Sequence, residues 1–547
     1  MVTQAGDASG KRQVAGGRPV MAVAAVTALL CLAVFLKALQ CGFVNWDDLG
    51  YVVQNRAIRH LDGKLIAWAC SSYAIDLWMP LTWLSFAVDY HFWGVNPLGY
   101  HLTNILLHAV NTGIVVLIAD ELVRSTGGEG LSPRLRAGML LAAGLLWGIH
   151  PLRVESVAWV AERKDVLNGL FTLGAVFCYL RYVRWRETGA GRSSWLYLAS
   201  LALFACSLMA KPVSVVVPAM LLVLDWYPLQ RQRQERLPRI LAEKVPFFLL
   251  SFAFSALSLY VASRLHILAS MANLSFVERI LVSGNALFEY IRLELVPTDI
   301  VPLYVIPAHL PLSYTVHTIV VVSAALLSIA ACRQRAPAVV TWFLFLLPLL
   351  PVLAFFQNAD QAYAARYTYL PSVAPCIVVA IAAGRACAKR RRLLRVPLVT
   401  ALLAVTVWYA VTTERLIGIW KNTGTLWTRV IEYHPLGRSY FNRGCYYYET
   451  GNYAAAIADF SAAIGIAAGN RMPLIYYLYA FRGAAYLTAG LNQEAVGDFT
   501  TAIEMYPRRN YYHFRGIALQ RLGRDKEAAE DFRRSQGDAT PIQWYWE

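Results

Sequence analysis

Residues 195–228 have the sequence WLYLASLALFACSLMAKPVSVVVPAMLLVLDWYP, which decides the fold class of this chain. The stretch contains two apolar runs, separated by Lys211 and Pro212, and each is nearly long enough to cross the hydrocarbon core of a bilayer. The whole chain of 547 residues shares this bias, since 57% of its residues are hydrophobic and only 15% are charged. Soluble proteins carry about 25% charged residues, so these proportions exclude a soluble enzyme, a disordered chain and a disulfide-rich mini-protein.

Similar apolar stretches recur up to residue 413, and they predict an all-α membrane domain, 1–413, ahead of a second domain, 414–547. We predict about eleven membrane spans, near residues 19–40, 101–123, 137–150, 166–183, 195–210, 212–228, 245–265, 313–332, 336–356, 367–387 and 396–413. The charged segment 275–296 would resist burial in lipid, so we place it as an amphipathic helix on the outer surface. If it crossed instead, the second domain would change sides.

The net charge of +16 would suit nucleic acid, but its distribution indicates membrane topology instead. Residues 414–547 are nearly neutral, with 15 basic and 13 acidic residues. The excess lies in basic runs between apolar stretches, at residues 11–18, 124–136, 181–192, 231–244, 333–335 and 389–395. Eleven spans and a cytoplasmic N-terminus place every run in the cytoplasm, as the positive-inside rule requires. The second domain then lies outside the cytoplasm, and we expect no nucleic-acid partner.

Three stretches after residue 435 repeat one pattern. In each, a glycine precedes an alanine by 12 residues, and a phenylalanine follows that alanine by four. The positions are Gly444, Ala456 and Phe460; Gly483, Ala495 and Phe499; and Gly516, Ala528 and Phe532. Small residues at such points let two antiparallel helices approach closely, so the pattern indicates a tetratricopeptide-repeat α-solenoid. Such an array typically binds an extended peptide or another protein, and a plain helical spacer is the alternative.

The predicted outer loops carry many ionisable side chains. Asp47 and Asp48 are adjacent in the first outer loop, where such carboxylates are usually turn or helix-cap residues. The second outer loop, 150–166, is dense enough in charge to be either a site or a solvated amphipathic turn of helix. Its ionisable residues are His150, Arg153, Glu155, Glu162, Arg163, Lys164 and Asp165. Lys211 caps the fifth span, and Arg366 precedes the tenth among tyrosines, a position that also suits an interfacial anchor.

Acids and cations on one membrane surface suit the transfer of a sugar from a lipid phosphate to a hydroxyl. The departing phosphate is a stable anion, so it needs fixed positive charge rather than a general acid. The candidates for binding it are Arg366, Lys211, Arg163 and Lys164. The incoming hydroxyl needs a base, for which Asp47 or Asp48 is the candidate.

The second predicted span carries a polar stripe. His101, Asn104, His108 and Asn111 follow steps of three, four and three residues, so they share one helix face. Hydrogen bonding between helices explains such a stripe, and the lining of a donor groove is the alternative. As candidates for that lining or for a second acid we take His150, Glu155, Glu162, His101 and His108.

Several sequence blocks together resemble one known family. The blocks are WDDLGYVVQN, NPLGYHLTNILLHAVN, HPLRVESVAWVAERKDVL, AKPVSVVVPAMLLVLDWYP and ARYTYLPS, followed by the repeats. They resemble the transmembrane and tetratricopeptide-repeat-containing O-mannosyltransferases and their bacterial relatives. The resemblance implies a type C glycosyltransferase fold, a polyprenyl-phosphate sugar as donor and an essential acid in the first outer loop. That acid maps onto Asp47 or Asp48, with Asp48 slightly preferred, and the phosphate-side cation maps onto Arg366.

We therefore expect a membrane glycosyltransferase, similar to O-mannosyltransferases, that modifies Ser or Thr of exported proteins bound by the repeats. About three repeats, rather than a long array, favour a bacterial inner membrane with the repeats in the periplasm or outside; the endoplasmic reticulum membrane is the alternative. Other functions left open are glycan transfer to a non-protein acceptor and a non-enzymatic scaffold for envelope assembly. The expected partners are the lipid-linked sugar, membrane lipid and the acceptor protein. We assign no metal ligands, although an acid pair could hold a divalent ion.

Overall fold

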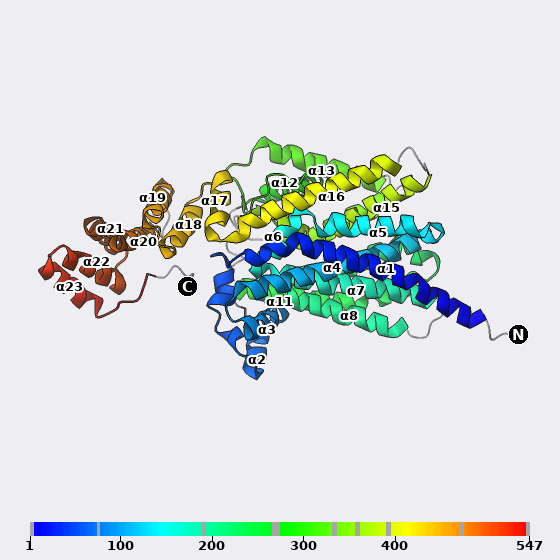
Figure 1. Ribbon diagram of the computed structural model, residues 1–547, viewed down its shortest axis with the longest axis horizontal. Helices are drawn as coiled ribbons and strands as arrows, with labels where there is room; N and C mark the ends of the chain where they lie inside the picture. The colour runs from blue at the N-terminus through cyan, green and yellow to red at the C-terminus, as the bar shows by residue number, and fades with distance from the viewer. Residues whose placement is uncertain are drawn as a thin grey trace. The chain divides into compact units, whose positions relative to one another are not determined.

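The computed structural model describes residues 5–73, 77–187, 193–264, 274–330, 336–355, 361–389, 395–469 and 475–542 (Figure 1). Contacts within the chain divide it into two units, Met1–Lys421 and Asn422–Glu547. Each unit is helical, so the all-α fold predicted from the sequence is confirmed.

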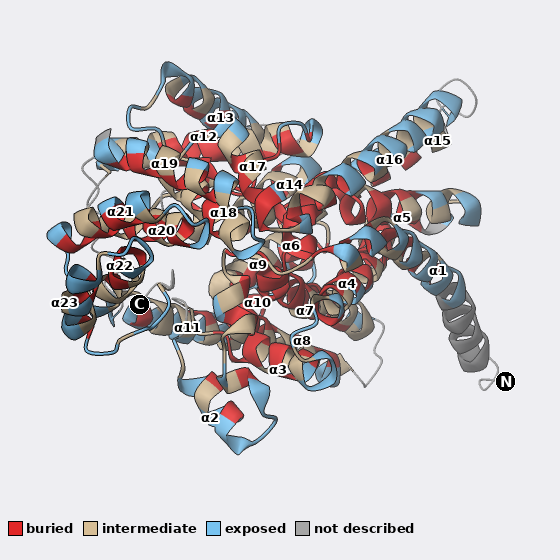
Figure 2. Cartoon of the chain, turned by 60° about the vertical axis from the view of Figure 1, so that its left-hand side comes forward, coloured by how far each residue is buried: buried red, intermediate tan, exposed pale blue. Residues whose placement is uncertain are grey.

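The first unit is a bundle in which α1 packs against α4 and α5, α4 against α7, and α7 against α8. Its helices are α1 (Ala5–Phe35), α2 (Gly63–Ser71), α3 (Pro80–Trp93), α4 (Pro97–Ser125), α5 (Pro133–Gly148), α6 (Val154–Ala158), α7 (Arg163–Glu187), α8 (Ser193–Ala210), α9 (Val217–Trp226), α10 (Leu237–Ala242), α11 (Val245–Arg264), α12 (Phe276–Leu295), α13 (Leu312–Ala330), α14 (Ala336–Leu346), α15 (Val373–Lys389) and α16 (Arg395–Ile417). Buried residues gather around α4, α6 and α7, as Figure 2 shows.

Many of these helices suit a bilayer. Among the described residues, seven helical segments are long and apolar enough to cross a membrane, and an eighth is the bent pair Pro133–Gly148 and Pro151–Ala158. Three shorter apolar helices of this unit cover Pro212–Trp226, Ala336–Val352 and Val373–Ala388. Every predicted span coincides with one of these helices, and the amphipathic α12 is not among them. The chain is therefore a multi-pass membrane protein.

Large apolar side chains cover the outside of this bundle. Leu29, Phe252, Leu327 and Leu403 are among the most exposed, at 64%, 75%, 70% and 61%. Water would penalise so much contiguous apolar surface, whereas lipid tails would not. These faces are consistent with helices that contact lipid.

Acidic side chains pair with three of the predicted cytoplasmic basic runs, and the buried Asp120 binds Arg124 and Arg136 of one of them. Glu121 at the end of α4 pairs with Arg181 at 3.0 Å and with Arg184 at 2.9 Å. Arg231 pairs with Glu243 at 2.7 Å. The run 333–335 lies outside the described residues, and the runs 181–192 and 389–395 lie partly outside them.

The bend between α5 and α6 brings the second outer loop into the protein. The two helices meet at 50°, and Pro151, which has no N–H to donate, starts the short helix η6 (Pro151–Arg153) at the break. All seven ionisable residues that we singled out in this loop are buried. The loop is therefore not a solvated amphipathic turn, which was one of the two interpretations that its sequence allowed.

A short β-ladder positions the segment before α15. Strands β1 (Tyr304–Val305) and β2 (Gln361–Tyr363) pair antiparallel, and the rings of Tyr304 and Tyr363 stack at 4.1 Å. Strand β2 leads into the short helix η12 (Ala365–Thr368), which carries Arg366. The ladder thus fixes the direction from which Arg366 enters the bundle.

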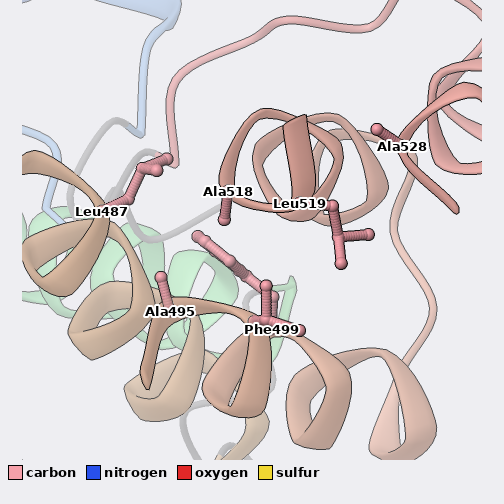
Figure 3. Packing of buried hydrophobic residues seen from close by; sticks show 7 residues of the cluster. Leu487, Ala495, Phe499, Ala518, Leu519 and Ala528 are labelled. Carbon is pink, nitrogen blue, oxygen red and sulfur yellow. The ribbon is translucent and has the colours of Figure 1, made fainter. Parts of the chain in front are cut away.

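The second unit is a stack of helix pairs. Its helices are α17 (Thr423–Tyr433), α18 (Gly437–Glu449), α19 (Tyr453–Gly469), α20 (Ile475–Thr488), α21 (Asn492–Met505), α22 (Arg509–Arg521) and α23 (Asp525–Ser535). A Cβ atom on Gly444 would lie 2.8 Å from the ring of Phe460, and one on Gly516 would lie 2.9 Å from Phe532. The close approach that the glycine and phenylalanine spacing predicted is confirmed, and Figure 3 shows Phe499 in the cluster between α21 and α22.

Each repeat also contains an ion pair that we did not predict. The arginine directly before the glycine of each repeat pattern binds, through two nitrogens, the aspartate that lies 16 residues later on the second helix of the repeat. The pairs are Arg443–Asp459, Arg482–Asp498 and Arg515–Asp531, each at 2.7–2.8 Å. Their regular spacing in the sequence was a signal that could have been used.

Replacing Arg482 by Met should destabilise the repeats. The change leaves the mostly buried carboxylate of Asp498 without its partner, and such a loss costs about 3 kcal/mol. Hydrogen–deuterium exchange of the α20 and α21 amides in the full chain should become faster. The control is Arg534→Met, which removes a pair whose arginine is 55% exposed and should cost less than about 1 kcal/mol. Equal exchange in the two variants would show that the buried pair contributes little.

Candidate functional site

Charged side chains from four separate segments meet in the first unit. They come from the loop after η1 (Leu36–Gln40), from the stretch formed by α6, η7 (Val160–Glu162) and the start of α7, from the residue before η8 (Pro212–Val216) and from η12. We define the charged cluster as Asp47, Glu155, Glu162, Lys164, Asp165, Lys211 and Arg366.

Glu162 is the centre of the charged cluster. Its side chain is 1% exposed, and its Oε1 lies 3.1 Å from Nζ of Lys164 and 3.3 Å from Nε of Arg366. The other oxygen, Oε2, lies 3.5 Å from Nζ of Lys211. One buried carboxylate thus gathers three cations, all of which we had named as phosphate ligands.

Two further acids neutralise the same cations. Asp165 Oδ1 lies 2.5 Å from Nζ of Lys211, and Glu155 pairs with the guanidinium of Arg366. The backbone N–H of Arg366 also donates to Glu155 at 3.0 Å. Buried charges are tolerated only when they are paired in this way.

The adjacent aspartates differ in their surroundings. Asp48 is buried, and its two oxygens accept backbone N–H groups of Val44 at 2.9 Å and Ala161 at 2.8 Å, which ties the first outer loop to the second. The side chain of Asp47 keeps 27% exposure, and its Oδ2 lies 3.7 Å from Nζ of Lys164. Burial raises the pKa of both carboxyls; Lys164 offsets part of the rise for Asp47, and the two N–H donors do so for Asp48. Asp47 is thus the more accessible of the two carboxylates.

Aromatic rings flank the cations of the charged cluster. Arg366 lies 4.7 Å from the ring centre of Tyr367 and 5.6 Å from that of Trp159. Lys164 lies 4.8 Å from the ring centre of Tyr51. Trp159 in turn stacks on Trp420 at 5.2 Å. These rings keep bulk water from the cations and attract them through their π faces.

A small pocket opens beside the charged cluster. Its charged lining residues are Asp165, Lys211 and Arg366, and Asn168, Ser214, Tyr367 and Tyr369 also line it. The remainder of its wall is largely apolar and includes Val213, Val216, Val217, Met220, Pro348, Val352, Leu370 and Pro371. The pocket therefore offers both cations and apolar contacts.

Arg163, the fourth predicted phosphate ligand, makes different contacts. Its side chain is fully buried, where it pairs with Asp89 at 2.6 Å and donates to the carbonyl of Tyr100 at 2.9 Å. It also bonds Asn104 on α4. These partners use its donors to join α3 and α4 to the start of α7.

The polar stripe on α4 anchors the second outer loop and η12. Asn104 donates to the carbonyls of Val157 and Trp159, at 3.3 Å and 3.2 Å. The ring nitrogens of His108 lie 2.8 Å from the hydroxyl of Tyr369 and from the carbonyl of Gly148. Hydrogen bonding within the protein, the first of our two interpretations, describes these residues.

Two other predicted histidines are buried away from the cations. His150 contacts the carbonyl of Glu294 at 3.1 Å and packs on the ring of Tyr409 at 4.4 Å, and His101 is fully buried in α4. Within the described residues, neither histidine contacts a member of the charged cluster. No group of three or more His, Cys, Asp or Glu side chains suited to a metal ion occurs within the described ranges.

Asp165 and Trp159 are members of this site that the sequence did not single out for a role. Asp165 was counted only as one of several charges, and Trp159 was not considered. Asp165 and Asn168 are three residues apart on one side of α7, and Glu162 lies three residues before Asp165 in the preceding short helix, a spacing that was a usable signal. Asn168 donates to the carbonyl of Lys211 at 3.0 Å and so holds that residue in place.

Comparison with protein families identifies the second unit. Residues 437–470 and 482–541 each match the tetratricopeptide repeat family. These ranges contain α18–α19 and α21–α23, together with much of α20. The repeats predicted from the sequence are confirmed.

Comparison with known proteins finds relatives that match between 31% and 40% of this chain. Drosophila melanogaster "Protein O-mannosyl-transferase Tmtc2" is 37% identical over 196 residues, covering 34% of this chain and 20% of that protein. "Protein O-mannosyl-transferase tmtc2" of Xenopus laevis is 33% identical over 172 residues, which cover 31% of this chain and 19% of that protein. Human "Protein O-mannosyl-transferase TMTC2" is 31% identical over 235 residues, which cover 40% of this chain and 26% of that protein. The chain thus matches about a quarter or less of the length of these relatives. Over the matched part, this chain is similar to proteins named protein O-mannosyl-transferases.

Proposed function

We propose that this protein is a membrane glycosyltransferase that moves a sugar from a polyprenyl phosphate to Ser or Thr of exported proteins. The observation that carries the proposal is the gathering of Lys164, Lys211 and Arg366 around Glu162, beside an accessible Asp47. The names of the homologues support a protein O-mannosyltransferase.

The donor phosphate binds beside the cations of the pocket in this proposal. Lys211 and Arg366 both line the pocket, so they can bind phosphate oxygens while the polyprenyl tail lies along the apolar wall. Glu162 holds these two cations between turnovers, because it already contacts both. Since Glu155 and Asp165 also neutralise them, the phosphate must displace carboxylate contacts as it binds. Arg163 positions α7 rather than binding donor.

The transfer step needs one base and one stabilised leaving group. The acceptor hydroxyl oxygen bonds to the anomeric carbon while the bond from that carbon to the phosphate oxygen breaks, with inversion. The hydroxyl proton passes to the carboxylate of Asp47, and the electron pair of the broken bond stays on the phosphate. Lys211 and Arg366 stabilise the negative charge that develops there. Asp48 holds the loop that presents Asp47.

Other parts of the chain supply the acceptor and the compartment. The repeats bind the acceptor polypeptide, and the positive-inside rule places them and the charged cluster outside the cytoplasm. We propose the bacterial inner membrane. A scaffold for envelope assembly would need one membrane anchor and no buried charged cluster, so the structure gives that alternative no support. Transfer to a non-protein acceptor would use the same donor site and is an outcome of the first test below.

Replacing Asp47 by Asn should abolish transfer while the protein stays folded. The amide cannot accept the proton, and loss of a positioned base lowers rates by about 10²–10⁴-fold. The measurement is sugar transfer from a polyprenyl-phosphate sugar to a Ser/Thr peptide by purified protein in lipid nanodiscs. Asp62→Asn is the matched control, because Asp62 caps α2 in the same outer loop and Asn caps equally well.

The companion variant Asp48→Asn separates the two aspartates. An amide in this position can accept only one of the two backbone N–H groups, so this variant should be less stable as well as less active. If the Asp47→Asn variant kept full activity, Asp47 would not be the base. Turnover of the donor with a glycan acceptor, and never with peptide, would instead support the non-protein alternative.

Replacing Lys211 by Gln should weaken donor binding. Hydrogen bonds to charged groups contribute about 1.5–3 kcal/mol, so the KM for the donor should rise by about 10-fold or more, with the KM for the peptide unchanged. Arg59→Gln, which removes an exposed cation of the first outer loop, is the control and should change neither KM. An unchanged donor KM in the Lys211 variant would contradict the assignment of the pocket.

A further inference from the structure

The chain turns back onto the repeats after α23. Gln536 and Gly537 both have left-handed backbone conformations, with φ of 52° and 77°, and they reverse its direction. Asn510 at the start of α22 then donates to the carbonyl of Thr540 at 3.3 Å. We define the tail as residues 537–542, which have the sequence GDATPI.

Ile542 is the apolar contact of the tail. It packs against three separate hydrophobic clusters of the second unit. The clusters draw on different repeats, and α20 contributes to each of them, through Leu487, Ala480 and Phe481. One side chain at the end of the tail therefore contacts a surface built by neighbouring repeats around α20; Figure 3 shows the cluster that contains Leu487.

The tail is attached to this surface like a bound peptide. It forms no helix or strand, and Ile542 is only partly buried. The buried members of the three clusters all come from α18–α23, so the clusters are complete without the tail. The N–H groups of Gly537 and Asp538 donate to neighbouring Ser535 at the end of α23, and beyond this turn the described residues show one hydrogen bond between the repeats and the tail backbone, the one from Asn510. An attachment of this kind can be displaced by a similar peptide.

We propose that the face of the repeats around α20 is a binding surface for an extended peptide with an aliphatic anchor, and that the tail occupies it until such a peptide displaces it. The tail shows the chemistry that fits: a Thr-Pro pair, which favours extended backbone, followed by isoleucine. Thr540 also resembles a hydroxyl acceptor residue. The proposal deepens the acceptor-binding role given to the repeats, but peptide binding can be measured without sugar transfer.

The test is competition between the tail and a peptide of the same sequence. A fluorescent peptide corresponding to residues 536–542, QGDATPI, is titrated against full-length protein in nanodiscs, with fluorescence anisotropy as the measurement. Replacing Ile542 by Asp should release the tail, because a carboxylate cannot occupy the apolar surface. We expect the peptide to bind this variant at least 10-fold more tightly than the wild type, in which the tail competes.

Matched variants keep the result interpretable. Leu491→Asp places the same charge on an apolar residue of the second unit that is 43% exposed and belongs to none of the three clusters, so it should bind like the wild type. A labelled peptide with Asp in place of its isoleucine should not bind any variant. Two results would show that the tail is a structural cap and would overturn the proposal. One is equal peptide affinity in the Ile542→Asp variant and the wild type; the other is a loss of repeat stability in Ile542→Asp without peptide binding. Loss of sugar transfer alone would leave this result unaffected.

Discussion

The arrangement of the site depends on one buried carboxylate. Glu162 contacts Lys164, Lys211 and Arg366, which come from three different segments of the chain. Burying a charge is costly unless it is paired, so these segments must approach one another for any of the four charges to be tolerated. The apolar helices satisfy this requirement by enclosing the second outer loop, and the same enclosure leaves a pocket that Lys211 and Arg366 help to line. Stability and the proposed donor binding therefore use the same cations.

Much of the fold could be predicted from the sequence, because the bilayer imposes long apolar segments and the repeats impose a fixed spacing. The membership of the site could be predicted only in part. Arg163 and Lys164 are neighbours in sequence, but successive residues of a helix point about 100° apart, so one faces Asp89 and the other Glu162. A charge pattern shows that both are present, but only the packing of α7 shows which one reaches the charged cluster.

The same limit applies to the adjacent aspartates and to the tail. The preference for Asp48 came from a resemblance, whereas exposure and backbone hydrogen bonds distinguish Asp47 as the accessible carboxylate. The glycine and phenylalanine spacing predicted how the repeat helices pack, since those contacts are local. It could not predict that Ile542 returns to α20, because an extended segment has no periodicity that records its partner.

The most direct test of this account is selective binding of the lipid phosphate. Native mass spectrometry of the purified protein, incubated with a polyprenyl phosphate and with a polyprenol of equal chain length, measures how much of each lipid is retained. The account predicts at least 10-fold tighter binding of the phosphate, about 1.4 kcal/mol, and predicts that replacing Lys211 and Arg366 together by Gln removes the difference. Equal retention of the two lipids by the wild type, or an undiminished preference in the double variant, would contradict it.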